Sequence, residues 1–187
     1  MNETISSGDG EVSDKNIDGG DYAWDSLENT PFKGDEMSAT ENEDYFTFEG
    51  EEYRNLNKID ISTEHGKYEW LDALIENSIT RKEAELEKAQ ADGYKQGDEV
   101  FDDLSAELNF GKRQQKILTE RIRIDGEGGV VGALQREYVA SHEYLSKLQN
   151  NGASQNAIDM AYEHYQASSN LLGLIESEIS RREREIA

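Results

Sequence analysis

The sequence predicts a mainly α-helical protein, built as a four-helix bundle or as paired helical hairpins and preceded by an extended acidic arm with a small β-hairpin. Two observations predict this class. Apolar residues recur at helical spacing through residues 67–187. Charge is also divided unevenly, because residues 1–66 hold 18 acids against four bases and the rest holds 23 against 15. We therefore divide the chain into an acidic arm (1–44), a hairpin-like junction (45–66) and a helical body (67–187).

The arm is polar, acidic and rich in turn-forming residues, a composition that disfavours an independent folded core. Its few large apolar side chains predict a short docking segment, formed by Tyr22, Trp24, Leu27 and Phe32. Aromatic side chains bury a large area at low entropic cost once a groove receives them. The groove belongs either to a partner or to the chain's own helices.

A second pattern in the arm partly matches a calcium-binding loop. Asp14, Asn16 and Asp18 fall at loop positions 1, 3 and 5, and Asp25 falls at position 12. Two features oppose a calcium site, because position 8 is Asp21 instead of an apolar residue and position 12 is Asp instead of the longer Glu. We therefore favour an acidic, turn-rich tail and expect neither a metal nor another cofactor.

The junction has a different composition, with aromatic residues on both sides of a glycine. In residues 45–61, apolar side chains flank a turn at Glu49–Gly50–Glu51–Glu52, namely Phe46, Phe48, Tyr53 and Leu56. This arrangement predicts a β-hairpin. An isolated hairpin is marginally stable, so we expect it to pack on the helical body or to extend a neighbour's sheet.

Four helical segments follow, each with one apolar stripe and each separated from the next by glycine. The first two are expected at about 67–92 and 98–124, with Asp98 as the cap of the second and a weak point at Gly111. The last two are expected at about 130–149 and from Ser154 onward. Short connections favour antiparallel neighbours, and the narrow stripes of the last two helices favour coiled-coil pairing within or between chains.

One segment of the body reverses the prevailing charge. Residues 111–123 contain a single acid among five cations, namely Lys112, Arg113, Lys116, Arg121 and Arg123. We interpret this stretch as a docking patch for an acidic partner or for the chain's own arm, and the alternative is a solvated helix face.

Several function classes are disfavoured by composition. The net charge of −22 opposes direct binding to nucleic acid or to an anionic membrane. The chain has no cysteine, no long apolar run and no basic or apolar signal-peptide region at its start, and it shows no hydrolase, nucleotide-binding or helical metal-binding motif. We therefore expect a soluble protein that is not an enzyme and is intracellular or assembled into a particle.

An acidic arm on a helical body favours a structural, assembly or adaptor role, with protein partners and self-association through the helices. Scaffolding, cement and connector-type components of phage and viral virions offer an analogy at the level of architecture. The alternative is an acidic mimic of nucleic acid that inhibits a nucleic-acid-binding enzyme or defence system.

Overall fold

The structure is a computed structural model that describes residues 44–186, all of which fall within one compact unit. This part of the chain is mainly helical, which confirms the predicted fold class. Its elements are β1 (Tyr45–Phe48), β2 (Glu51–Arg54), the short 3-10 helix η1 (Leu56–Lys58), α2 (Glu64–Ala91), α3 (Glu99–Arg121), α4 (Gly129–Asn150) and α5 (Gln155–Ile186).

The predicted β-hairpin is present, with a tighter turn than the sequence indicated. β1 and β2 are antiparallel, and the ring of Phe46 stacks on that of its cross-strand partner Tyr53. Glu49 and Gly50 both have positive φ (50° and 92°), the conformation of a two-residue turn whose twist matches the strands. Glu51 and Glu52 therefore belong to β2, and the four-residue turn was wrong.

The hairpin packs on the helical body, which was the first of the two expected modes. Asn77 of α2 imitates a neighbouring strand, because its Nδ2 donates to the Arg54 carbonyl oxygen and its Oδ1 accepts from the Arg54 amide, both at 2.9 Å. An ion pair between Arg54 and Glu69 (2.5 Å) lies beside these bonds. The open edge of β2 is thus paired with a side chain of α2.

The helix ends follow local side-chain chemistry. α2 begins three residues earlier than expected because Thr63 Oγ1 accepts a hydrogen bond from the Gly66 amide (3.0 Å). Asp98 precedes α3 as predicted, but its carboxylate accepts from the Lys95 amide in the loop (2.8 Å) instead of from a helix amide. α3 ends at Arg121 because Ile122 is extended.

Gly111 does not interrupt α3, which runs through it from Glu99 to Arg121. A Cβ atom at this position would lie 3.2 Å from Cγ1 of Ile79 on α2. The missing side chain therefore lets the two helices approach closely, and the weak point predicted there stays a prediction.

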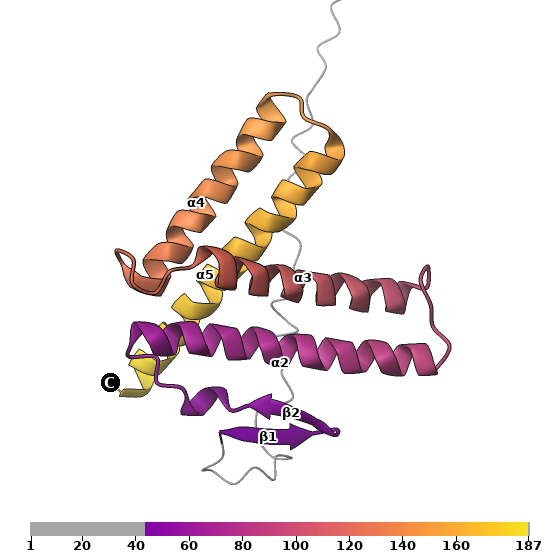
Figure 1. Cartoon of the computed structure of the whole chain (residues 1–187), viewed down its shortest axis with the longest axis horizontal. Coiled ribbons are helices and arrows are strands. Elements are labelled where there is room, and N and C mark those ends of the chain that lie inside the picture. Colours follow the sequence, from indigo (N-terminus) through magenta and orange to yellow (C-terminus); the bar gives the residue numbers. More distant parts are fainter. Residues whose placement is uncertain (1–43, 187) are drawn as a thin grey trace, which may run out of the picture. The chain divides into compact units, whose positions relative to one another are not determined.

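The helices form two antiparallel pairs, α2 with α3 and α4 with α5, which cross one another (Figure 1). The shared core lies where the pairs meet. Each helix contributes at least one fully buried side chain to it, namely Leu71 of α2, Leu118 of α3, Leu134 of α4, and Leu171 and Ile175 of α5. Of the two predicted arrangements, paired helical hairpins describe the structure best.

The shared core occupies only one half of each helical pair. It includes the amino-terminal halves of α2 and α4 and the later parts of α3 and α5. The halves that carry the α2–α3 and α4–α5 loops therefore extend beyond the core as two-helix projections (Figure 1). Within residues 44–186, no helix combines the length and apolar character that crossing a membrane requires.

Candidate interaction surface on the second helical hairpin

Two of the candidate sites lie outside residues 44–186, so the structure does not describe them. They are the arm anchor (Tyr22, Trp24, Leu27 and Phe32) and the calcium candidate (Asp14, Asn16, Asp18 and Asp25). Both interpretations stay predictions.

The basic stretch of α3 lies between the other helices and is largely engaged by them. Three of its cations form ion pairs, each with a different helix: Lys112 with Glu83 of α2 (2.8 Å), Arg113 with Glu163 of α5, and Arg121 with Glu137 of α4 (3.7 Å). Lys116 and Arg123 are exposed and form no ion pair within the described residues. Docking of the arm or of an acidic partner at this patch stays a prediction. Lys116 and Arg123 are the cations available for it.

A carboxylate from α2 occupies the amino-terminal end of α4. Glu64 Oε2 accepts from the amide of Val130 at 2.7 Å, and a Cβ atom on Gly129 would overlap this carboxylate. The hydrogen bond from Lys67 lowers the pKa of Glu64, and the Val130 amide adds to this effect against a smaller opposing effect of burial. The backbone amide of Val130, at the start of α4, thus binds a carboxylate supplied by the chain itself.

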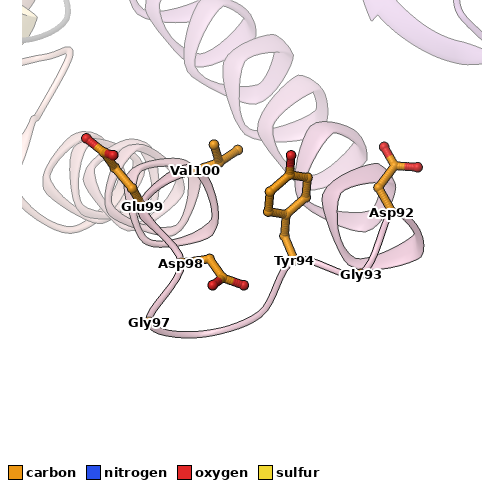
Figure 2. Close-up of a pocket in the computed structure, with 7 residues that line it drawn as sticks. All are labelled: Asp92, Gly93, Tyr94, Gly97, Asp98, Glu99 and Val100. Carbon is orange, nitrogen blue, oxygen red and sulfur yellow. The ribbon is translucent and has the colours of Figure 1, made fainter.

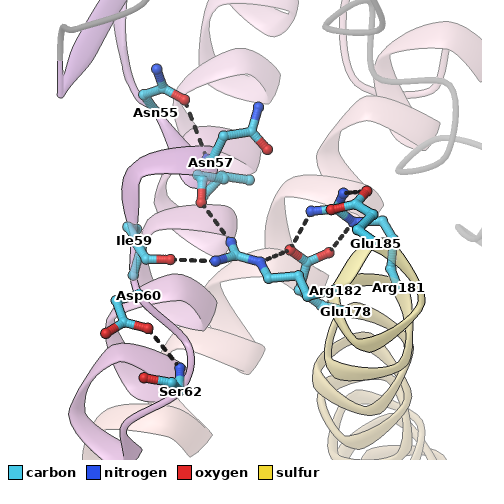
Figure 3. A network of polar contacts seen from close by, with 10 residues as sticks. Asn55, Asn57, Ile59, Asp60, Ser62, Glu178, Arg181, Arg182 and Glu185 are labelled. Carbon is cyan, nitrogen blue, oxygen red and sulfur yellow. Dashed lines mark hydrogen bonds and ion pairs between the residues drawn. The ribbon is translucent and has the colours of Figure 1, made fainter. Parts of the chain in front are cut away.

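A second network fixes the end of α5 to the segment before α2 (Figure 3). Arg182 donates to the carbonyl oxygens of Ile59 (2.6 Å) and Leu56 (3.0 Å), and its Nε donates to Glu178 Oε1 (2.7 Å). Burial alone would raise the pKa of Glu178, but hydrogen bonds from Arg181 and Arg182 outweigh it, so the pKa is lowered. The network is therefore an internal clamp between positions more than 120 residues apart.

The core also contains a polar contact between the two helical pairs. Gln114 of α3 donates from Nε2 to Oδ1 of Asn170 on α5 at 2.6 Å, and both side chains are buried. Among the described residues, no buried side-chain nitrogen or oxygen lacks a hydrogen-bond partner. The buried polar groups of the crossing therefore serve packing and register.

A shallow hollow of about 560 Å³ lies at the α2–α3 loop (Figure 2). Its carboxylates include Asp92, Asp98 and Glu99, and Asp98 is already bonded to the Lys95 amide. It is wide open to solvent, and none of its seven lining residues is a serine, threonine, histidine, lysine or arginine.

The exposed apolar side chains of the body concentrate on the projecting half of the second hairpin. Eight large hydrophobic side chains are exposed among the described residues, and four of them lie on this half: Val139, Tyr144, Met160 and Tyr162. Their exposed fractions range from 38% to 59%. We take this half as the candidate site, because it carries half of the exposed large apolar side chains of the described residues, and exposed apolar area of this kind is typical of parts that contact another macromolecule.

An aromatic cluster joins α4 to α5 in the same half. The ring of Tyr165 lies 5.5 Å from that of Tyr138, 5.4 Å from that of His142 and 6.4 Å from that of Tyr162. The hydroxyl groups of Tyr138 and Tyr165 are 3.5 Å apart. This hydrogen bond, together with burial, raises the pKa of Tyr165 to about 12. The four rings therefore form one continuous aromatic contact between the two helices.

The histidines of the body do not form a metal site. His164 Nε2 lies 2.7 Å from Glu137 Oε1, which links α5 to α4. No group of three or more potential metal ligands occurs among residues 44–186.

The sequence analysis missed this surface, although a signal was available. Residues 138–162 contain only three charged residues, Glu143, Lys147 and Asp159, in a chain where 32% of residues are charged. A local charge count, in addition to the apolar stripe, would have identified the segment.

Comparison with protein-family models, curated proteins and solved structures gave no match. The function is therefore argued from the residues and their geometry.

Proposed function

We propose that this chain is a non-enzymatic assembly or adaptor protein. Its helical body self-associates, and its acidic arm contacts protein partners. By analogy of architecture alone, scaffolding, cement and connector-type virion components provide the nearest kind of role.

The observation that carries the proposal is the projecting half of the α4–α5 hairpin. It lies outside the shared core and exposes apolar side chains along two packed helices. Isolated exposed apolar residues are ordinary on a protein surface, whereas a cluster on one projection favours a contact role. Its low local charge also reduces the repulsion that a −22 chain otherwise presents to acidic proteins.

The polar clusters support the same proposal. The carboxylates of Glu64 and Glu178 bind amide or guanidinium groups of the chain itself. Three cations of α3, Lys112, Arg113 and Arg121, bind acids of the neighbouring helices. These groups have structural partners in place, so they argue for a scaffold with specified geometry.

The test is to purify the full chain at its native level together with co-migrating proteins and to measure the mass of the complex by light scattering. Incorporation into a larger complex that persists in about 0.5 M salt is expected, because apolar contacts are not screened. A chain that stays monomeric at all accessible concentrations and co-migrates with nothing would refute the proposal.

One observation favours nucleic-acid mimicry as a second candidate. Glu99, Asp102 and Asp103 are exposed and fixed on the first turns of α3, so part of the acid is held on a rigid helix. A mimic would bind a basic nucleic-acid-binding protein with an affinity that falls steeply as salt rises, whereas an assembly contact through apolar residues would not.

A further inference from the structure

One face of the α4–α5 hairpin contains no charged residue. On α4 it consists of Gln135, Val139, His142 and Ser146, which recur at intervals of four, three and four and therefore share a helix face. All four are exposed or half-buried.

The matching strip on α5 has the same spacing. It consists of Ile158, Tyr162, Tyr165 and Ser169, none of which is buried. The ring contacts of Tyr165 with His142 and with Tyr162 join the two strips into one surface. We call these eight residues the uncharged face.

The chemistry of the uncharged face indicates what covers it. A basic partner would be matched by carboxylates and an acidic partner by cations, and none of the eight residues carries either; at one end of the face, the carboxylate of Glu176 on α5 accepts a hydrogen bond from Gln135 Nε2 (3.4 Å). Its amide, hydroxyl and imidazole groups can each both donate and accept hydrogen bonds. A surface with such groups is complementary to itself, which is what a two-fold symmetric contact requires, because the same patch is used on both copies.

We propose that the uncharged face binds the uncharged face of a second copy of this chain, so that two α4–α5 hairpins form a four-helix bundle between chains. This inference rests on the proposed self-association and specifies its surface. Val139 and Tyr162, at 51% and 38% exposure, supply its apolar anchors.

The size of the face sets the strength of the contact. Eight residues a side is well below the 20–30 residues of a standard interface, so the dimer is weak and its Kd is on the order of micromolar or above. Glu143 and Asp159 border the face and carry like charge. Added salt therefore screens their repulsion and strengthens the dimer.

The experiment is sedimentation equilibrium of the full chain over a wide concentration range, at low and at moderate salt. The variants are V139E and Y162E, each of which places an acid against its own copy in the dimer. The matched control is V100E, because Val100 is exposed to 49% and lies on α3, in the other helical pair. Helicity and the urea midpoint verify that each variant is folded, as expected for substitutions of exposed side chains.

The wild-type chain and V100E are expected to dimerise alike, and V139E and Y162E are expected to raise Kd at least tenfold. If V139E and Y162E dimerise as tightly as the wild-type chain, the uncharged face is not the contact, while the proposed self-association remains intact. V100E weakening the dimer as much as V139E would also overturn the uncharged face. A wild-type chain that stays monomeric at about 1 mM would refute both this inference and the self-association on which it rests.

Discussion

Replacing Glu178 by Gln tests whether the clamp between α5 and the segment before α2 stabilises the fold. The carboxylate accepts three hydrogen bonds, two from Arg181 and one from Arg182, and its side chain is only 9% exposed. A hydrogen bond to a charged group contributes about 1.5–3 kcal/mol. Arg181 is 42% exposed, so water replaces much of its share.

The contribution that remains comes mainly from Arg182, which is 20% exposed. We therefore expect E178Q to lower the free energy of unfolding by about 2–3 kcal/mol. With a urea m-value of about 2 kcal/mol/M, the midpoint falls by about 1–1.5 M. The assay is urea unfolding followed by circular dichroism at pH 7, with E183Q as the control, because Glu183 is exposed on the same helix and forms no ion pair within residues 44–186.

The effect of E178Q depends on pH in a defined direction. The folded-state pKa of Glu178 is lowered, so its carboxylate stabilises the fold fully above the ordinary glutamate pKa of about 4.3. This stabilisation is lost as pH falls through the folded-state pKa, and wild type and E178Q then converge. A midpoint shift for E178Q no larger than that for E183Q at pH 7 would show that the clamp does not contribute to stability.

Three further predictions concern the junctions between elements. N77A removes two hydrogen bonds to β2, so hydrogen exchange of the 51–54 amides is expected to accelerate with a loss of about 1–3 kcal/mol, and unchanged protection would contradict the pairing. G66A places a Cβ atom against the Asp60 carbonyl oxygen, so a fall in thermal midpoint equivalent to more than about 3 kcal/mol is expected, and a stability equal to wild type would show that the backbone relaxes freely. E64Q removes the charge that caps α4, which is expected to cost about 0.5–1 kcal/mol of folding free energy at pH 7. Because the folded-state pKa of Glu64 is lowered, this cost vanishes as pH falls well below 4. A cost that persists at low pH would rule out a role for the charge.

The order and type of the elements could be predicted because their signals are local. Apolar spacing identifies each helix, and the glycines at its ends mark its limits to within about three residues. The turn was less certain, since Glu51 and Glu52 are as suited to a loop as to an exposed strand. Their place in β2 follows from the positive φ of Glu49 and Gly50, which closes the turn in two residues.

The crossing of the two hairpins could not be predicted. Periodicity shows which side of a helix is apolar, but it does not show which part of that side meets another pair. The contacts of Asn77 with Arg54 and of Arg182 with Leu56 join residues 23 and 126 positions apart, and no sequence pattern announces them. The candidate surface was partly readable, because its low charge is local, whereas the alignment of its two strips depends on how α4 and α5 pair.

The shared core is confined to one half of each helical pair, so the length of each projection does not depend on the residues that form the core. Residues next to the α2–α3 and α4–α5 loops lie outside the shared core, so insertions of about seven residues in both helices of a pair would lengthen that projection and keep the stripe in phase. In the α4–α5 pair the insertion belongs on the loop side of Met160, because Arg113 of α3 contacts Met160 and Glu163. The shared core around Leu71, Leu118, Leu134 and Leu171 would be unchanged. Each projection can therefore vary in length during evolution, or be varied by design, independently of the other.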